Sequence, residues 1–269
     1  MAGPWVLKLG GDVVRDAEGL EGLAAEIRDC HISGQPLVIV HGGGPQGTAI
    51  MNRLGLEPRF AGGRRITDES TLEAMVMALP GQTSTALTAI LTKEGVPALG
   101  VSGVSSFLVE AEKRPPREII GHEELVDFGL VGDIRQVNTK AIMALIEAGF
   151  VPVIACLGMD RQGQVLNINA DVVAVDLAAR LKAELLVAVA GVPGVLADPS
   201  DMDSRFSQID ETLFAQQIEA GTIQGGMIAK LEEAFRAREA GIEQVLIAGP
   251  PHNGLLQACL AGEAGTRVL

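Results

Sequence analysis

Short runs of consecutive apolar residues alternate with longer stretches of helical periodicity along most of the chain. Strands of a parallel sheet that helices cover on both faces show such continuous apolar runs. The pattern predicts strands near residues 5–9, 36–41, 96–101, 151–156, 185–190 and 244–248. It predicts helices near residues 18–33, 46–55, 69–93, 138–149, 172–182, 211–219 and 226–240. We therefore expect an α/β fold, a three-layer αβα sandwich with a central, mostly parallel sheet.

Two segments interrupt this rhythm. Residues 58–68 and 104–135 contain Gly, Arg and Pro in place of a regular apolar pattern, and they predict hairpins or lid-like loops. The chain has no low-complexity tract and no internal repeat. We expect a single domain over residues 1–269, since this length suffices for one large α/β core.

Two of the predicted strands end directly in glycines. The first strand runs into Gly10 and Gly11, and the second runs into Gly42, Gly43 and Gly44. A glycine turn between a buried strand and a helix exposes backbone N–H groups at the positive end of the helix, which suits a phosphate. Ligands of parallel sheets sit beyond the carboxyl ends of the strands. Two such turns can hold one polyphosphate from two sides, and the lysine at position 8 adds a full charge.

The second glycine turn also matches the dinucleotide pattern G-x-G-x-x-G, at residues 42–47. That pattern alone is a weak signal, and a Rossmann fold needs a second strand that ends in an acidic residue about 20 positions on. Residues 57–63 read Glu-Pro-Arg-Phe-Ala-Gly-Gly, which is not a buried strand. A dehydrogenase is therefore the least favoured alternative.

Composition narrows the possible partners and the compartment. The net charge of −13 and the aromatic content of 3% argue against nucleic acid, which needs a basic face. The chain has neither a run of about 18 uncharged apolar residues nor a signal-peptide pattern, so we expect no membrane partner and a cytoplasmic protein. Cys30, Cys156 and Cys259 are odd in number and far apart, and we expect reduced, structural thiols.

Further motifs come after the glycine turns in a fixed order. The complete set stands at residues 8–11, 41–45, 63–68, 126–132, 167–171, 192–196, 226–230 and 265–267. Together these motifs resemble the amino acid kinase family, most closely its N-acetylglutamate kinases, over essentially the whole chain. The resemblance implies an amino acid kinase-like fold. Its N-terminal lobe, over about 1–160, binds the amino-acid substrate and forms the dimer, and its C-terminal lobe, over about 161–269, binds the nucleotide.

The activity that the resemblance implies is ATP-dependent phosphorylation of the side-chain carboxylate of N-acetyl-L-glutamate to an acyl phosphate, in arginine biosynthesis. ATP and Mg²⁺ are the expected cofactors. The family holds Mg²⁺ mainly through phosphates, so we expect no metal ligand from the chain. A carboxylate with an ordinary pKa of about 4.3 is already an anion at neutral pH, and the reaction needs no general base.

Three charged residues match the catalytic positions of the family. By resemblance, Lys8 contacts the transferred phosphoryl group and Lys230 acts on the nucleotide phosphates. Asp171 pairs with both lysines and keeps them charged and oriented. From the sequence alone, Asp171 is also a candidate helix cap, and Lys230 a solvated helix residue.

The glycines and the acceptor site are assigned in the same way. Gly11 and Gly44 give backbone N–H groups to the phosphoryl group, while Gly10 and Gly43 allow close approach. Gly10 and Gly11 are expected to contact the nucleotide, and Gly43 and Gly44 to contact the substrate. Gly194 is expected at the nucleotide.

Two further residues are expected to bind the amino acid. Arg65 matches the arginine that grips the α-carboxylate of the substrate, for which a guanidinium is well shaped. Its neighbour Arg64 stands where the family more often has an apolar residue. Asn167 matches the residue that bonds the α-substituents, while Asn169 and His41 are expected to be structural.

The chain departs from the family pattern at four places. Residues 190–191 read Ala-Gly instead of the Thr/Ser-Asp that binds nucleotide, and residues 80–85 and 104–106 also differ. The chain begins at the first strand, without the extra N-terminal helix of arginine-inhibited, hexameric members. We therefore expect a homodimer that is insensitive to arginine.

Two alternatives remain open. One is an aminoadipate or glutamate kinase of lysine biosynthesis whose substrate is linked to an acidic carrier protein. It would need a basic rim, and solvated surface cations are the simpler interpretation of the candidates, which are Arg59, Arg64, Lys113, Arg114 and Arg117. The other is a non-catalytic amino-acid or nucleotide sensor. Only the Ala-Gly pair favours a sensor, and the two lysines and Asp171 argue against it.

Overall fold

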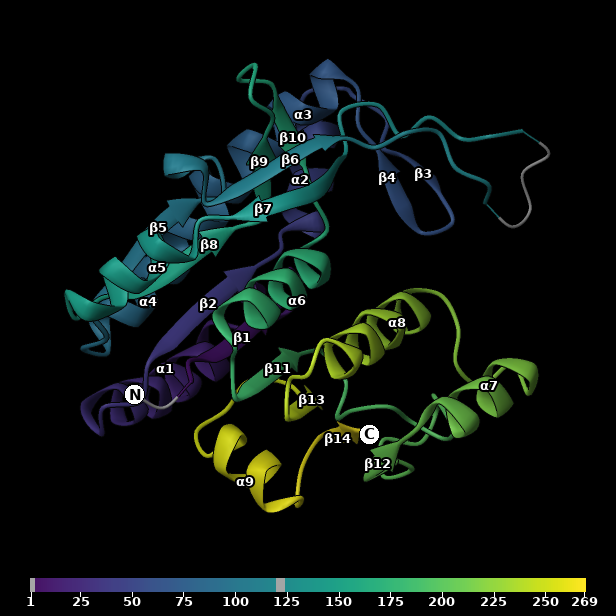
Figure 1. The fold of residues 1–269 in the computed structure, drawn as a ribbon. Coiled ribbons are helices and arrows are strands. Elements are labelled where there is room, and N and C mark those ends of the chain that lie inside the picture. The colour runs from purple at the N-terminus through teal and green to yellow at the C-terminus, as the bar shows by residue number, and fades with distance from the viewer. Residues whose placement is uncertain (1–2, 120–123) are drawn as a thin grey trace.

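An eight-stranded sheet runs through the whole molecule (Figure 1). A computed structural model describes residues 3–119 and 124–269 of the protein. Neighbouring strands of the sheet are parallel, except that β13 and β14 are antiparallel. In spatial order the strands are β12 (Gln208–Ile209), β14 (Thr266–Val268), β13 (Gln244–Ala248), β11 (Leu185–Val189), β1 (Trp5–Leu9), β2 (Leu37–His41), β8 (Val151–Ala155) and β5 (Ala98–Ser102).

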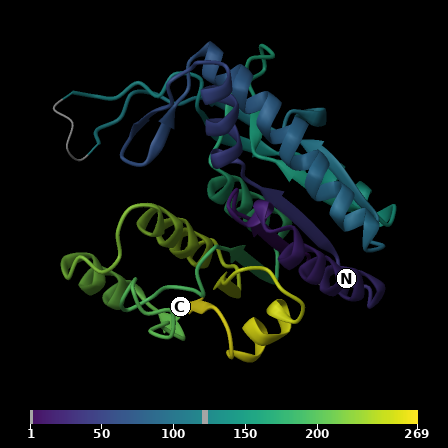
Figure 2. The same cartoon turned by 180° about the vertical axis from the view of Figure 1, so that it is seen from behind.

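Helices cover both faces of this sheet, as the apolar runs predict (Figures 1 and 2). Alternate residues of β1 point to opposite faces, since Val6 belongs to one buried cluster while Leu7 and Leu9 belong to the other. The first cluster packs against α5 (Thr139–Glu147), α6 (Ala170–Leu181) and α8 (Gly226–Glu239). The second packs against α1 (Ala17–Ile32), α4 (Ser84–Lys93) and α9 (Leu255–Ala261). The expected three-layer αβα fold is confirmed.

A smaller sheet and a hairpin stand beside the carboxyl ends of the main strands. The smaller sheet has the order β10 (Val165–Asn167), β9 (Leu157–Met159), β6 (Val109–Lys113) and β7 (Gly132–Val137). The hairpin of β3 (Arg59–Ala61) and β4 (Arg64–Ile66) projects above α8 in Figure 1. Hairpins were expected over 58–68 and 104–135, and both segments contain antiparallel pairs; residues 120–123 lie outside the described part.

The remaining helices include one long helical run. Two further helices are α2 (Gly44–Arg53) and α7 (Glu211–Glu219). The run Glu69–Lys93 joins α3 (Glu69–Val76), a π-helical segment over Met77–Thr83, and α4. By length and composition it is the one described helix able to cross a membrane, but core helices of soluble proteins pass the same test.

The two glycine turns lead into different structures. α2 begins at Gly44, directly after the second turn, as predicted. After the first turn the chain forms only a short 3-10 helix, Val13–Arg15, before α1 begins at Ala17. The helix α1 agrees with the helix predicted near residues 18–33.

Candidate active site

A cavity of about 260 Å³ opens at the carboxyl ends of β1 and β2. The two glycine turns form one side of it, and the β3–β4 hairpin forms another. Eight of the residues expected from the sequence line this cavity: Lys8, Gly10, Gly11, Gly43, Gly44, Arg65, Asn167 and Asp171. Lys230 lies beside it, in a smaller adjoining pocket that also contains Lys8 and Asp171.

The glycine turns lie face to face at contact distance. A Cβ atom on Gly11 would stand 2.7 Å from Cδ of Pro45 and 3.1 Å from Cα of Gly43. A Cβ atom on Gly43 would stand 2.7 Å from a methyl carbon of Leu79. Real Cβ atoms do not approach so closely, so this packing requires glycine at both positions. Within the described ranges, the N–H groups of Gly11 and Gly44 donate to no acceptor, which leaves them free for a ligand.

Two lysines share one carboxylate at the base of the cavity. Lys8 Nζ lies 2.7 Å from Asp171 Oδ1, and Lys230 Nζ lies 3.7 Å from the same oxygen. The side chains of Lys8, Asp171 and Lys230 come from β1, α6 and α8, and their exposed fractions are 7%, 19% and 15%. Together they place one net positive charge in a site that is largely shielded from water.

Burial and pairing set the pKa values of these three groups. Burial disfavours the charged Lys8, but Asp171 outweighs it and raises the pKa of Lys8 above its ordinary value. Burial also disfavours ionised Asp171, yet the two lysines hold its pKa below the ordinary range. Burial and repulsion from Lys8 lower the pKa of Lys230 to about 8. Of the three groups, Lys230 is therefore the one whose pKa lies nearest to neutral pH.

Asp171 is oriented by the start of α6. The N-cap residue of this helix is Asn169, whose side chain accepts a hydrogen bond from the backbone N–H of Asp171 at 2.7 Å. Asn169 thus has the structural position expected for it, and Asp171 lies in the first turn and is not the cap. A carboxylate in a first helical turn interacts favourably with the helix dipole, which supports the ionised state.

Arg65 reaches the second glycine turn from the hairpin. Its Nη2 atom donates to the carbonyl oxygen of Gly44 at 3.0 Å and to Oγ1 of Thr48 at 2.8 Å. The guanidinium also lies over the ring of Phe60, 4.7 Å from its centroid. One edge of the Arg65 guanidinium is therefore held by α2, and the side chain also lines the cavity.

Asn167 joins the far wall of the cavity to the residue after β4. Its Nδ2 atom donates to Oγ1 of Thr67 at 3.2 Å. The side-chain carbonyl oxygen of Asn167 remains an acceptor, so the amide can present it to a ligand N–H group.

Arg114 and Cys156 also line the main cavity, although the sequence predicted neither as a site residue: Arg114 was considered only for a basic rim and Cys156 only as a structural thiol. Arg114 is 7% exposed and pairs with Asp133 at 2.8 Å, although it lies in a polar, proline-rich stretch. Burial raises the pKa of the Cys156 thiol to about 12, so the thiol stays protonated and is a poor nucleophile. Cys30, Cys156 and Cys259 are all free thiols, as expected.

His41 is fully buried at the end of β2. Its Nδ1 atom lies 3.0 Å from the carbonyl oxygen of Gly42, and burial lowers its pKa. The cavity lining does not include it, in agreement with the expected structural role.

Gly194 lies apart from the glycine turns, at a separate and mainly apolar cavity of about 350 Å³. Val192, Leu196, Ile223 and Met227 line the same cavity. The φ angle of Gly194 is 153°, and a Cβ atom there would stand 2.6 Å from Oγ1 of Thr266, so glycine is required. A mainly apolar cavity of this size suits a flat heteroaromatic group.

The chain offers no ready-made metal site within residues 3–119 and 124–269. No group of three or more His, Cys, Asp or Glu side chains comes together there. The carboxylate of Asp171 lines the main cavity, and two lysines already occupy it. A Mg²⁺ ion at this site fits only as a partner of phosphate oxygens.

Two glycine turns with free backbone N–H groups, two largely buried lysines and an arginine stand around one cavity of a parallel α/β sheet, an arrangement that suits phosphoryl transfer. The sequence profile of the amino acid kinase family matches residues 3–249, and the chain belongs to this family.

Named relatives and a solved structure agree with this assignment. The chain is 46% identical over 264 residues to the acetylglutamate kinase of Anaeromyxobacter dehalogenans (strain 2CP-C), covering 97% of each chain. It is 42% identical over 242 residues to the acetylglutamate kinase of Methanopyrus kandleri, covering 90% of this chain and 93% of that one. The crystal structure of smu.665 from Streptococcus mutans UA159 superposes with a TM-score of 0.79 at 28% identity, covering 90% of this chain and 93% of that one.

Proposed function

We propose that the protein uses ATP to phosphorylate the side-chain carboxylate of N-acetyl-L-glutamate, a step of arginine biosynthesis. The observation that carries this proposal is the Lys8–Asp171–Lys230 cluster at the junction of the two glycine turns. The names of relatives that match this chain over nearly its full length support the acceptor.

The acceptor would enter from the hairpin side of the main cavity. Arg65 would bind its α-carboxylate through the guanidinium edge that α2 does not occupy. Asn167 would bond the acetamido group. The side-chain carboxylate would then face Lys8, which offsets the repulsion between this anion and the triphosphate.

The transfer needs positioning and charge more than acid–base chemistry. A carboxylate oxygen attacks the γ-phosphorus, the bond to the β,γ-bridging oxygen breaks, and ADP leaves with that electron pair. The N–H groups of Gly11 and Gly44 would donate to the γ-phosphoryl oxygens, and both lysines would stabilise the developing charge. Gly10 and Gly43 let the backbone approach the phosphates.

The nucleotide would span the two cavities. Its base would occupy the apolar cavity beside Gly194, and its phosphates would extend along the start of α8 toward Lys230. Mg²⁺, held by the phosphates, supplies charge neutralisation to the triphosphate when bound. The N-terminal lobe, over about 1–160, would thus serve the amino acid and the C-terminal lobe, over about 161–269, the nucleotide.

The carrier-protein alternative receives little support from the surface charges. Four of the five cations considered for a basic rim already pair with carboxylates: Arg59 with Asp68, Lys113 with Asp127, and Arg114 and Arg117 with Asp133. With a net charge of −13, the chain would also repel an acidic carrier at long range. A free amino acid derivative is the better acceptor on these grounds.

We further propose that the enzyme is a cytoplasmic homodimer. Two apolar side chains on the long helical run, Val76 and Met77, are 39% and 44% exposed, and association would cover them. Light scattering at working concentration tests this, and a monomer or a hexamer would contradict it.

One assay tests the acceptor. ADP release is measured with N-acetylglutamate, glutamate, aspartate and N-acetyl-aminoadipate, and hydroxylamine traps any acyl phosphate as a hydroxamate. We expect trapped product with N-acetylglutamate and at least 10-fold less with the others, about 1.4 kcal/mol of discrimination. Turnover with none of the four would overturn the proposal and favour a carrier-linked substrate or a sensor.

A further inference from the structure

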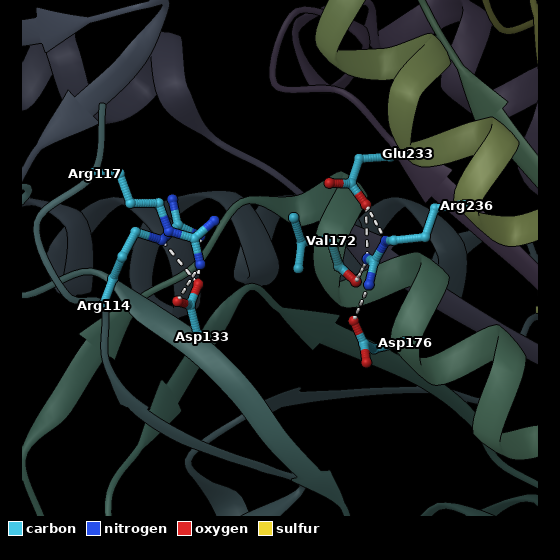
Figure 3. Close-up of polar contacts among 7 residues, drawn as sticks. All are labelled: Arg114, Arg117, Asp133, Val172, Asp176, Glu233 and Arg236. Carbon is cyan, nitrogen blue, oxygen red and sulfur yellow. Dashed lines mark hydrogen bonds and ion pairs between the residues drawn. The ribbon is translucent and has the colours of Figure 1, made fainter. Parts of the chain in front are cut away.

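A second, polar cavity of about 280 Å³ adjoins the active-site cavity and shares Arg64, Arg114 and Asn169 with it. Its walls carry two ion-pair clusters on opposite sides of Val172 (Figure 3). On one wall, near β6 and β7, Arg114 and Arg117 both pair with Asp133. The other wall comes from α6 and α8, and the proposed chemistry uses none of its three charged residues, which are Asp176, Glu233 and Arg236.

Arg236 joins the two helices of this second wall. Its guanidinium contacts Oε2 of Glu233 through Nη2 at 2.6 Å and through Nε at 2.7 Å. Its Nη1 atom donates to Oδ2 of Asp176 at 3.0 Å, and Nη2 approaches the carbonyl oxygen of Val172 at 3.5 Å. Figure 3 shows Arg236 between Glu233 on α8 and Asp176 on α6. One side chain of α8 thus contacts α6 at two points, Asp176 and Val172, and is held on its own helix by Glu233.

These contacts lie next to the catalytic cluster in the sequence. Val172 directly follows Asp171, and Glu233 comes three residues, about one helical turn, after Lys230. Arg236 therefore bridges the two helical turns that place Asp171 and Lys230 together. The direct Lys230–Asp171 distance of 3.7 Å is longer than a hydrogen bond. Other contacts must therefore fix the position of α8 on α6.

Partly buried apolar side chains, Met227 and Ile228, hold the first turn of α8 against the core. The helix begins after Gly225, whose φ angle is +55°, and no side chain caps its N-terminus. The fully buried side chains of α8 begin at Leu231, one residue after Lys230. The side chains of Glu233 and Asp176 are 17% and 16% exposed, while that of Arg236 is 42% exposed, so the ion pairs are partly shielded from water.

We propose that Arg236 is a positioning residue that fixes α8 on α6 and thereby holds the Lys230 ammonium beside Asp171 and Lys8. It touches no reacting atom and acts through Lys230. The inference deepens the proposed function, because it assumes that Lys230 acts on the nucleotide phosphates.

The test compares two arginines that share one carboxylate. Arg236→Gln removes the bridge between the helices. Arg180→Gln is the matched control, because Arg180 also pairs with Asp176, at 3.7 Å, but lies on α6 itself. We expect kcat to fall about 10-fold to 100-fold in Arg236→Gln, the scale of a misplacement near 1 Å, and less than 3-fold in Arg180→Gln. Arg236→Lys has a single ammonium in place of the planar guanidinium, so it should retain only part of the wild-type kcat.

The titration of Lys230 gives a readout that needs no turnover. Lys230 faces Lys8 from β1, Asp171 from α6 and Glu233 on its own helix, and Cys156 lies beside Lys8. Displacement of α8 would expose Lys230 and move it from Lys8, so its pKa should rise from about 8 toward its ordinary value. NMR of ¹³C-labelled lysine measures this in the full chain, with a Lys230→Arg variant to assign the signal.

An unchanged Lys230 titration in Arg236→Gln, together with kcat equal to that of Arg180→Gln, would overturn the inference. If Arg236→Gln fails to fold, Asp176→Asn serves in its place, because it keeps the volume and removes the charge that Arg236 contacts on α6; the same two results in that variant would again overturn the inference. Failure of the proposed function has a different signature, namely a wild-type enzyme that traps no acyl phosphate while the Lys230 titration still shifts.

Discussion

The ammonium of Lys8 and the carboxylate of Asp171 are 2.7 Å apart, and little of either side chain reaches water. An ion pair between shielded groups is strong, but each partner then depends on the other for its charge. Because Lys230 uses the same carboxylate oxygen, the electrostatics of the whole site depend on Asp171.

Replacing Lys8 with alanine should impair transfer far more than nucleotide binding. Lys8 contributes most where negative charge develops, so we expect kcat to fall by roughly 10²–10³-fold, the usual loss for one preorganised donor. The dissociation constant of ATP, measured by calorimetry, should change less than about 10-fold (1.4 kcal/mol). Lys93→Ala is the control, because Lys93 pairs with Glu21 on the surface and should give wild-type kinetics. An intact kcat in Lys8→Ala would remove Lys8 from the mechanism.

The pH profile should report Lys230. A lowered pKa means that Lys230 becomes neutral as the pH rises through about 8, so kcat/KM for ATP should fall there. In kcat the fall should come at higher pH, since bound phosphates favour the charged amine. Asp171 adds no acid limb above about pH 4, because its pKa is lowered.

The variant Asp171→Asn reverses the balance of charges around Lys230. Without the carboxylate, the two lysines repel each other, and the fall in kcat/KM should move to a pH below that of the wild type. A profile that is the same in both proteins would show that another group titrates.

Arg65→Ala should weaken acceptor binding selectively. Loss of a charge-assisted contact costs about 1.5–3 kcal/mol, so we expect KM for the amino acid to rise about 10-fold to 150-fold, with a smaller change in kcat. Arg59→Ala is the matched control on the same hairpin, since Arg59 pairs with Asp68 at an exposed position. Equal KM values in the two variants would contradict the assigned role.

Glu26 should matter for stability and not for turnover. This buried carboxylate on α1 accepts hydrogen bonds from the N–H groups of Leu256 at 3.0 Å and Gln257 at 2.9 Å, at the start of α9. Glu26→Ala leaves both groups without a partner, and the free energy of unfolding should fall by about 2–4 kcal/mol in urea titration. Glu21→Gln, at an exposed position of the same helix, should change it by less than about 0.5 kcal/mol. Because α1 and α9 cover the face opposite α6 and α8, kcat should be unchanged.

The central strands were predictable because both of their faces are buried. All six predicted runs are strands within two residues of the expected bounds, and β1 and β13 coincide with them. The strand β6 was missed, since its period-two pattern is short: Val109 and Ala111 are buried while Glu110 and Glu112 are not. The strands β12 and β14 are two and three residues long, too short for any periodicity.

The sequence predicted those parts of the candidate site that have a local sequence signal, either a glycine after a strand or a charged residue in a motif. Gly11 and Gly43 stand two residues after the ends of buried strands, and a parallel sheet brings such ends together. The burial of Arg114 has no local sequence signal, because it depends on how β6 and β7 pack around a polar segment. The contact of Arg236 with Asp176 likewise depends on how α8 lies on α6, which helical periodicity does not specify.

The position of β1 in the sheet has a consequence for the reaction cycle. In the strand register, Lys8 pairs with Ala188 of β11 on one side and with Val40 of β2 on the other. Both strands are hydrogen-bonded to β1. The backbone of this lysine therefore cannot shift without breaking ladders on two sides. In the proposed reaction, donor and acceptor therefore come to a lysine whose backbone is held in place, with α8 on one side and the β3–β4 hairpin on another.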